Sequence, residues 1–373
     1  MSKKFITPLI DLKAEYQLIK DEIDQAIKKV VESGSFILGE EVVFLEKEIA
    51  DYCQTKYAVG VASGTEALFL PLLALDIRPD DEIITTPFTF IATAEVIALL
   101  RAKPVFVDIN PHTFNIDISK IEEAITPRTK AIIPVHLYGQ PADMDFLLDL
   151  ALKYNLTIVE DAAQAIGAEY KGKKVGSFGQ VGALSFFPAK NLGGYGDGGM
   201  ILTNDEEIYQ KLKMLRVHGS SERYIHKYIG TNARLDEIQA AILRVKLRYL
   251  GDWIKKRRNI ATKYTDLLSQ ARVKTPFVES FNLHVYNQYT IRAKERDRLS
   301  MRLLDEGIPT AVHYPIPLHL QEAFSYLKYK KGDFPESERA AREVLSLPIY
   351  PELKKETVEI IAHLIQRYTQ DEG

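Results

Sequence analysis

The residues best suited to chemistry lie in the stretch Ser185-Phe-Phe-Pro-Ala-Lys-Asn-Leu-Gly-Gly-Tyr-Gly-Asp-Gly-Gly199. Within it, Lys190 follows an apolar run and precedes five glycines in seven positions. Apolar neighbours such as Phe186 and Leu192 would strip water from the ammonium group, which lowers the pKa of a lysine. A neutral lysine amine attacks carbonyl groups, so the stretch indicates Schiff-base chemistry. The simpler alternative is a tight glycine turn that carries a surface lysine.

A second candidate lies where Ser63-Gly64-Thr65 separates a short buried strand, 57–62, from an apolar helix that begins near Glu66. Free backbone N–H groups and the helix dipole attract anions at a helix N-terminus, and Thr65 adds a hydroxyl. The segment therefore predicts an anion site. Ordinary helix capping by Ser63 or Thr65 is the alternative explanation.

The elements that must position these residues are strands and helices that alternate along the chain. Alternation at this spacing is typical of parallel βαβ units with right-handed crossovers. From residue 82 onward, strands are predicted at 82–86, 104–108, 131–136, 157–161 and 200–204, and helices at 88–100, 118–125 and 144–154. Flanking segments predict helices at 15–33, 40–53, 297–306 and 354–369, a long helical region at 235–271 and a strand at 285–293.

Ligands of such sheets bind at the carboxyl ends of the strands. The pattern places Ser63 to Thr65, Phe88 to Phe90, His136 and Asp161 at these ends, so we expect them near one another. A carboxylate at the position of Asp161 can pair with a protonated ring nitrogen. A helix cap or an internal salt bridge is the alternative role for this aspartate. The polar segment 216–234 is predicted to form an active-site loop.

Length and composition limit the class of protein. The 373 residues exceed what one core usually holds, so we expect a large domain at 1–250 and a smaller one at 251–373. A net charge of −3 with mixed signs gives no reason to expect a nucleic acid partner. A single cysteine, Cys53, fits a reducing compartment. The N-terminus lacks a signal peptide and no stretch is long enough to span a membrane, so we expect a soluble cytoplasmic protein without a metal site.

Four phrases together resemble one known family. These are Ala62-Ser-Gly-Thr65, Glu160-Asp-Ala-Ala-Gln164, Ser185-Phe-Phe-Pro-Ala-Lys190 and Asn232-Ala-Arg-Leu-Asp-Glu-Ile-Gln-Ala240. Their order and context are similar to the DegT/DnrJ/EryC1/StrS aminotransferases, over nearly the whole chain. The resemblance implies an α/β protein of aminotransferase fold type I, similar to aspartate aminotransferase. Its large, mostly parallel sheet domain would bind pyridoxal 5'-phosphate (PLP), and its small C-terminal domain would be α+β.

The resemblance also implies a role for individual residues. Lys190 matches the lysine that forms the Schiff base and shuttles protons, and Asp161 matches the partner of the pyridine nitrogen. The other implied cofactor contacts are Gln164 near the ring hydroxyl, Phe90 stacked on the ring, and Gly64, Thr65 and Ser185 around the phosphate. Asn232 matches a phosphate ligand from the neighbouring subunit, which implies a homodimer with shared sites. Arg234, His313 and Tyr314 resemble substrate contacts.

The implied reaction is a ping-pong transamination. Glutamate would leave its nitrogen as pyridoxamine 5'-phosphate (PMP) and depart as 2-oxoglutarate, and a nucleotide-linked keto-sugar would then accept the nitrogen. Gln164 in Glu-Asp-Ala-Ala-Gln is more similar to the family members that aminate the third carbon than to those that aminate the fourth. The sugar is thus expected to be a UDP-linked 2-acetamido-3-keto-glucuronic acid or a dTDP-linked 3-keto-6-deoxyhexose. The pathway would make a cell-surface polysaccharide such as the O-antigen of lipopolysaccharide.

Three other functions are alternatives to this one. The first is amination of a 4-keto sugar nucleotide. The second is a regulatory protein that binds PLP without turnover, against which the intact Lys190 and Asp161 argue. The third is a nicotinamide-dependent dehydrogenase, which fails because no Gly-x-Gly-x-x-Gly follows the first strand.

Overall fold

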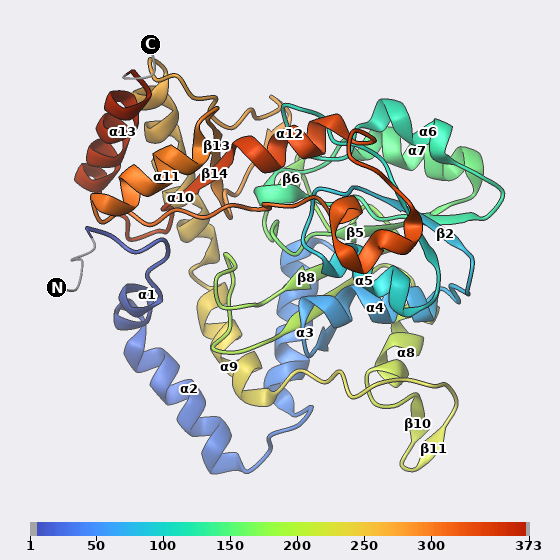
Figure 1. Ribbon diagram of the computed structural model, residues 1–373. Helices are drawn as coiled ribbons and strands as arrows, with labels where there is room; N and C mark the ends of the chain where they lie inside the picture. Colours follow the sequence, from blue (N-terminus) through green and yellow to red (C-terminus); the bar gives the residue numbers. More distant parts are fainter. Residues whose placement is uncertain (1–5, 371–373) are drawn as a thin grey trace.

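The computed structural model describes residues 6–370. Residues 1–5, which belong to the N-terminus that was expected to lack a signal peptide, lie outside the described part. A seven-stranded sheet forms its centre (Figure 1), with strand order β1-β9-β8-β5-β4-β2-β3. The strands are, in this order, Tyr57–Val61, Gly199–Thr203, Val181–Ser185, Thr157–Asp161, Thr129–Ile132, Glu82–Thr85 and Lys103–Phe106. Their mostly parallel pairing confirms the predicted α/β class.

Strand β9 departs from the predicted parallel alternation, because it runs antiparallel to both β1 and β8. The connection from β8 to β9 is the glycine-rich stretch itself, in which no helix forms. A parallel partner requires a crossover connection, usually a helix, so a loop that turns directly back yields an antiparallel pair. The loop that carries Lys190 therefore begins and ends at the same end of the strands, where Ser185 of β8 pairs with Gly199 of β9.

Helices cover both faces of the sheet and bury its alternating side chains. Along β9, Met200 and Leu202 face one helix layer, whereas Ile201 faces the other. The layer on the side of Ile201 contains α4 (Gly64–Ala74), α5 (Ala92–Leu99) and α8 (Glu206–Leu215). The opposite layer contains α3 (Glu40–Cys53), α6 (Ile121–Ala124), α7 (Met144–Tyr154) and α9 (Glu237–Leu247).

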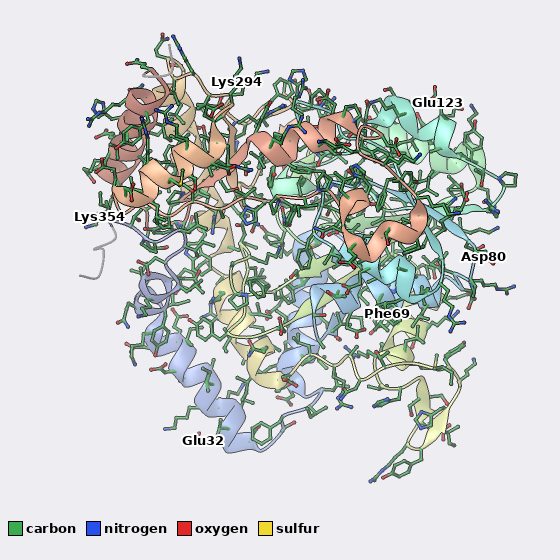
Figure 2. All side chains as sticks on the ribbon, viewed as in Figure 1. Glu32, Phe69, Asp80, Glu123, Lys294 and Lys354 are labelled. Carbon is green, nitrogen blue, oxygen red and sulfur yellow. The ribbon has the colours of Figure 1, made fainter. Side chains whose placement is uncertain are left out.

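A separate apolar cluster gathers the C-terminal elements (Figure 1). It packs β13 (Tyr289–Arg292) and β14 (Val344–Leu347) against α10 (Leu250–Leu268), α11 (Arg296–Asp305) and α13 (Lys355–Gln370). Side chains fill the space between these ribbons, and Lys294 and Lys354 lie on this side of the molecule (Figure 2). The domain boundary at residue 250 stays a prediction.

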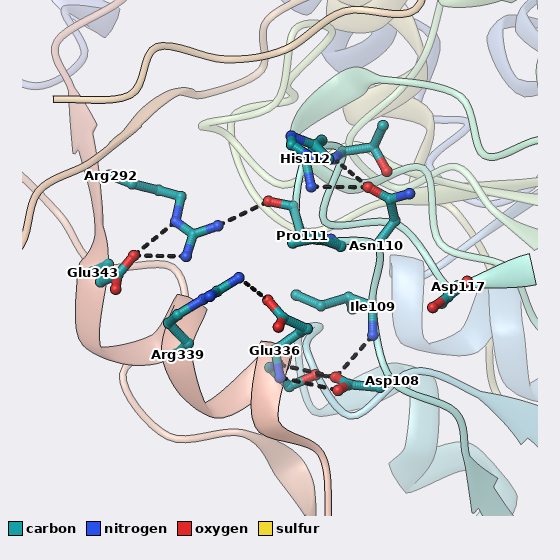
Figure 3. A network of polar contacts seen from close by, with 12 residues as sticks. Asp108, Ile109, Asn110, Pro111, His112, Asp117, Arg292, Glu336, Arg339 and Glu343 are labelled. Carbon is teal, nitrogen blue, oxygen red and sulfur yellow. Dashed lines mark hydrogen bonds and ion pairs between the residues drawn. The ribbon is translucent and has the colours of Figure 1, made fainter. Parts of the chain in front are cut away.

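A polar network attaches this C-terminal part to the large sheet (Figure 3). Asp108, two residues beyond β3, accepts hydrogen bonds from the backbone N–H groups of Glu336 and Ser337 at 3.0 and 2.9 Å. These two residues open α12 (Pro335–Glu343), so a carboxylate distant in sequence caps that helix. Arg292 of β13 donates to Glu343 and to the carbonyl of Pro111. The two parts are thus tied together beside α12.

Several predicted boundaries were wrong for local reasons. The helix expected at 15–33 is divided into α1 (Leu12–Leu18) and α2 (Lys20–Ser33), because Ile19 has non-helical angles of φ −124° and ψ 20°. The helix expected at 88–100 begins only at Ala92. Residues 86–88 form a turn instead, with Pro87 at its centre, in which the Phe88 N–H donates to the Thr86 hydroxyl. The region 235–271 is divided near Tyr249 into α9 and α10.

The remaining elements are short. The strand expected at 285–293 shrinks to β13, and the loop expected at 216–234 contains a hairpin of β10 (Ser220–Glu222) and β11 (Ile225–His226) that projects from the body in Figure 1. A further sheet pairs β12 (Asn282–Leu283) with β6 (Glu169–Tyr170), and β6 with β7 (Lys173–Lys174). Short 3₁₀ helices occupy Ile118–Lys120, Leu137–Gly139, Leu318–Leu320 and Glu322–Leu327. No helix within residues 6–370 has the length and apolar character needed to cross a bilayer.

Candidate active site

A cavity of about 600 Å³ opens at the carboxyl ends of the parallel strands. Its wall includes the last residues of β5 and β8 and residues shortly beyond the ends of β1, β2 and β4, as the parallel pattern predicted. Nine of the predicted site residues lie in this wall: Gly64, Thr65, Phe90, Asp161, Gln164, Ser185, Lys190, His313 and Tyr314. Asn232 and Arg234 do not.

Lys190 lies on the loop between β8 and β9, as predicted, and its backbone N–H donates to the carbonyl of Phe187 at 2.9 Å. Desolvation lowers the pKa of its amine to about 8, while the opposite charge of Asp161 acts in the raising direction. Of the apolar neighbours in the sequence, Phe186 and Leu192 are fully buried, whereas Phe187 is 53% exposed and lines the cavity with Lys190.

Glycine is required in the turn that follows the lysine. A Cβ atom on Gly193 would lie 2.3 Å from the carbonyl oxygen of Pro188, which no other residue type can accommodate without a shift. The carbonyl of Gly193 also accepts a 2.7 Å hydrogen bond from the buried ammonium of Lys246 on α9. Together these contacts fix the loop on which Lys190 sits.

Asp161 ends β5 with only 6% of its surface exposed. Its carboxylate accepts hydrogen bonds from the Thr93 hydroxyl at 2.7 Å and from the Ala163 N–H at 3.1 Å. Burial raises its pKa, whereas these two bonds and the charges of Lys190 and His136 act in the lowering direction. The carboxylate thus faces the cavity with a hydroxyl and a backbone N–H as its bonded partners.

The first turn of α4 lies where the sequence predicts an anion site. Ser63 acts as the helix cap, because its Oγ accepts the Glu66 N–H at 3.1 Å, so the capping explanation holds for this residue. Gly64 lies so close to Ser185 that a Cβ would approach the serine Cβ to 2.7 Å. A Cβ on Gly199 would lie 2.3 Å from the Ser63 carbonyl oxygen. Three chain segments therefore meet around the N-terminus of α4, with the Thr65 side chain in the same wall.

Aromatic and amide groups form the other side of the cavity. The ring of Phe90 is 55% exposed in the single chain and lies 6.2 Å, centre to centre, from the ring of Tyr314. Gln164 accepts from the Tyr138 N–H at 2.7 Å and donates to the Tyr314 hydroxyl at 3.1 Å. His313 contacts the Ser346 hydroxyl at 2.9 Å, and burial is the main reason that its pKa falls to about 4. Its imidazole is therefore neutral near pH 7.

Asn232 and Arg234 lie on a segment that runs beside the end of β1, where Arg234 bridges Val61 and Asn232 bridges Val217. Asn232 is exposed, and the Nε atom of Arg234 is buried without a hydrogen-bond partner in the described structure. The structure does not bring either residue into the cavity of its own chain.

The sequence did not identify some residues of the cavity. Thr93, Asn287 and Gln288 all belong to its wall. The side-chain oxygens of Asn287 and Gln288 are buried and have no hydrogen-bond partner within residues 6–370. The Asn-Gln pair offered no signal because it lay inside a predicted strand. His136, which the pattern placed at a strand end, instead pairs with buried Glu160 at 3.0 Å and lies outside the wall.

The donor set of this cavity fits a phosphorylated pyridine aldehyde. A helix N-terminus with two close-packed glycines offers N–H groups to a phosphate, and Phe90 offers a ring face. A buried carboxylate and an amine of lowered pKa provide partners for a ring nitrogen and an aldehyde. The residues present therefore fit PLP.

Comparison with known proteins supports the same conclusion. The chain is 51% identical over 364 residues to a protein of Geobacillus stearothermophilus named "Pleiotropic regulatory protein", covering 97% of this chain and 98% of the relative. It is 48% identical over 352 residues to the UDP-2-acetamido-2-deoxy-3-oxo-D-glucuronate aminotransferase of Pseudomonas aeruginosa, covering 94% and 97%.

A solved structure has the same fold. The chain superposes on S. venezuelae DesV, determined in complex with a ketimine intermediate, with a TM-score of 0.96 and 42% sequence identity, covering 98% of this chain and 99% of DesV. The model of the DegT/DnrJ/EryC1/StrS aminotransferase family matches residues 17–366. With this match, these relatives and the geometry of the cavity, the chain belongs to the DegT/DnrJ/EryC1/StrS aminotransferase family.

Proposed function

We propose that the protein is a PLP-dependent aminotransferase that converts a nucleotide-linked 3-keto sugar into the 3-amino sugar. The observation that carries this function is the meeting, in one cavity, of an amine of lowered pKa at Lys190 and a buried carboxylate at Asp161. The cofactor is that of the family. The name of the Pseudomonas aeruginosa relative, a 3-oxo-glucuronate aminotransferase, supports the third carbon as the site of amination.

When bound, PLP supplies an aldehyde for the amino group and a ring that withdraws electrons from the neighbouring carbon. The chain supplies the remaining chemistry. Lys190 in its neutral form would accept the proton from the substrate carbon that bears the amino group and deliver it to the carbon of the former aldehyde, two bonds away across the nitrogen. Asp161 in its ionised form holds a proton on the ring nitrogen, and the first turn of α4 binds the phosphate.

The second side of the cavity orients the ring and the sugar. Phe90 gives an exposed ring face for stacking, and Gln164 is fixed by its bonds to the Tyr138 N–H and the Tyr314 hydroxyl. Because Gln164 donates to the oxygen of Tyr314, the tyrosine proton is directed elsewhere and is available to an acceptor on the ligand. Neutral His313 adds an uncharged hydrogen-bonding group.

The proposal includes glutamate as the amino donor and a homodimer as the active unit. The exposed position of Asn232, outside the cavity of its own chain, supports donation of this residue to the site of a second subunit. The buried, unpaired Nε of Arg234 supports a contact with an anionic group of the ligand. The single cysteine supports a reducing compartment such as the cytoplasm, and the amino sugar would enter a surface glycan such as the O-antigen.

A regulatory role deserves a separate test, because the relative with 51% identity carries a regulatory name. A protein that only bound PLP would not need a lysine of lowered pKa opposite a buried carboxylate. Half-reaction spectroscopy separates the two functions. With glutamate, an aminotransferase converts the PLP absorbance to that of PMP, whereas a protein without turnover leaves it unchanged.

The full reaction is tested with both keto-sugars. Purified protein should be yellow, and borohydride should fix the cofactor to Lys190. Glutamate and each candidate keto-sugar, generated in place by its upstream enzyme, are then supplied together, and NMR locates the amino group in the product. Amination of the third carbon is the expected result. Amination of the fourth carbon would overturn the regiochemistry, and a colourless protein that forms no adduct would overturn the function.

A further inference from the structure

The buried threonine next to Asp161 has no assigned role in the reaction. Thr93 lies in the first turn of α5 with none of its surface exposed, although the sheet could bury an apolar residue there at lower cost. Its hydroxyl lies 2.7 Å from Asp161 Oδ2 and 3.0 Å from the hydroxyl of Thr89. Both threonines and the aspartate belong to the cavity wall.

The chemistry of the three groups fixes the direction of these bonds. An ionised carboxylate can only accept hydrogen bonds, so Thr93 must donate its proton to Asp161. The oxygen of Thr93 is then the acceptor for Thr89, and the bonds run from Thr89 through Thr93 to Asp161. Each hydroxyl polarises the next, which strengthens the final bond to the carboxylate.

The remaining contacts of the carboxylate show why this bond matters. The other oxygen, Oδ1, accepts the Ala163 N–H at 3.1 Å, so each oxygen is held by one fixed donor. Burial opposes the ionised form of Asp161, and the Thr93 bond is the largest effect in its favour. The charged and titratable groups that face Asp161 are Lys190 on the glycine loop, His136 beyond β4, and Tyr314 on the loop before the 3₁₀ helix Leu318–Leu320.

We propose that Thr93 is a positioning residue that holds the Asp161 carboxylate ionised and oriented toward the ring nitrogen of the cofactor. Thr89 acts in the same direction by orienting the hydroxyl of Thr93. This inference rests on the proposed function, because it assumes that a pyridine ring lies in the cavity. It assigns to the first turn of α5, through the Thr93 hydroxyl, a part in controlling the ring.

The test follows the protonation of the ring nitrogen directly, without turnover. PMP labelled with ¹⁵N in the ring is bound to the protein, and the nitrogen shift is recorded as a function of pH. In Thr93→Val, which keeps the shape but loses the hydroxyl, the nitrogen should lose its proton at lower pH than in the wild type. Thr93→Ser keeps the hydroxyl and should retain the wild-type titration.

Two further variants separate this role from a structural one. In an Asp161→Asn background, the additional change Thr93→Val should leave the nitrogen titration where Asp161→Asn alone puts it, since both act through one carboxylate. Thr89→Val should cause a smaller shift in the same direction as Thr93→Val. The rate of the glutamate half-reaction should fall about tenfold to a hundredfold in Thr93→Val, as expected for loss of one hydrogen bond to a charged group.

A folded Thr93→Val protein with the wild-type nitrogen titration would overturn the inference and leave the proposed function intact. If Thr93→Val does not fold, the ring-nitrogen titration is measured in Thr93→Ala and in Thr89→Val instead. A wild-type titration in both of these variants would also overturn the inference. Failure of the wild-type protein to bind PMP would overturn the proposed function and the inference with it, and this result is seen in the wild-type arm alone.

Discussion

At the residue scale, two opposing effects act on the amine of Lys190. Desolvation favours the neutral form, and the negative charge of Asp161 favours the protonated form. Desolvation prevails, and the resulting pKa of about 8 keeps part of the amine neutral near physiological pH. An exposed lysine, with its pKa near 10.5, would be almost entirely protonated there and a poor nucleophile.

Replacement of this lysine tests its role. Lys190→Ala should lower the transamination rate by at least about two to four orders of magnitude, because the Schiff base and the proton acceptor are lost together. The variant should still bind PLP through the phosphate site, so it should be purified with cofactor that borohydride cannot fix. Lys331→Ala, a change at an exposed lysine, is the matched control and should keep wild-type activity. Turnover of Lys190→Ala within tenfold of the wild type would contradict the assignment.

The pH dependence of cofactor attachment follows from the same pKa. The amine reacts only when neutral, so the rate at which cofactor-free protein forms the PLP Schiff base should rise as pH increases through about 8. Asp161 acts to raise the pKa of Lys190, so Asp161→Asn should move this midpoint to lower pH. Stopped-flow absorbance across a pH series measures both midpoints. A midpoint near 10.5, or a shift to higher pH in Asp161→Asn, would refute this account.

At the scale of elements, the proposed phosphate site depends on how closely the first turn of α4 packs against the end of β8. Gly64 has no room for a side chain beside Ser185, and Gly199 has none beside the Ser63 carbonyl. These contacts bring the helix N-terminus and the serine to one point. The glycines therefore serve close packing of chain segments here, and neither needs a positive φ angle.

A methyl group at Gly64 tests this packing. Gly64→Ala should force the first turn of α4 away from Ser185, at a cost of about 1–3 kcal/mol typical of overpacked sites. The affinity for PLP should fall, whereas the affinity for pyridoxal, which has no phosphate, should change little. Isothermal titration calorimetry with both compounds checks the difference.

Gly251→Ala provides the matched control, because a Cβ at this exposed position of α10 meets no atom within 4 Å. Alanine is the better helix former, so the free energy of unfolding of this variant should rise by up to about 1 kcal/mol. The variant should therefore unfold at a higher temperature than the wild type. An equal loss of affinity for PLP and pyridoxal in Gly64→Ala would show that the packing does not act through the phosphate.

At the scale of the whole molecule, the cavity of one chain has a single cationic side chain in its described wall, that of Lys190. A doubly charged phosphate and a nucleotide diphosphate would need further donors. Asn232 and Arg234 lie outside this cavity, so we expect a second subunit to provide them. The homodimer is thus part of the proposed catalytic mechanism.

Mixed dimers test this arrangement. Lys190→Ala disables the site of its own chain, and Asn232→Asp, which places a negative charge near the phosphate, should disable the site of the partner. A mixed dimer would carry one site with both defects and one intact site. Mixing the two inactive variants under subunit exchange should restore activity to about a quarter of the wild-type value, since half of the dimers are mixed. No recovery despite proven exchange, or a fully active monomer in analytical ultracentrifugation, would contradict shared sites.

The sequence by itself determined the local elements and the residues with chemical potential. Lys190, Asp161 and the Ser63–Thr65 turn were identified because strand-to-turn-to-helix patterns and a glycine-rich loop depend on neighbours in the chain. The α/β class followed from the alternation of strands and helices. Resemblance to the family then suggested roles for residues such as Gln164 and Tyr314, which no local pattern explains.

Only the tertiary structure decided which residues beyond the strand ends join this cavity and which strand-end residue, His136, stays outside it. The antiparallel turn of β9, the pairing of His136 with Glu160 and the approach of Tyr314 to Gln164 join segments far apart in sequence. Periodicity predicts that a residue is buried but does not identify the residue that it contacts. The sequence therefore predicted for Thr93 only a position within a helix. Its place beside Asp161 arises because α5 packs on the sheet at the end of β5. Such contacts are set by the packing of whole elements, and the sequence of any one segment does not contain them.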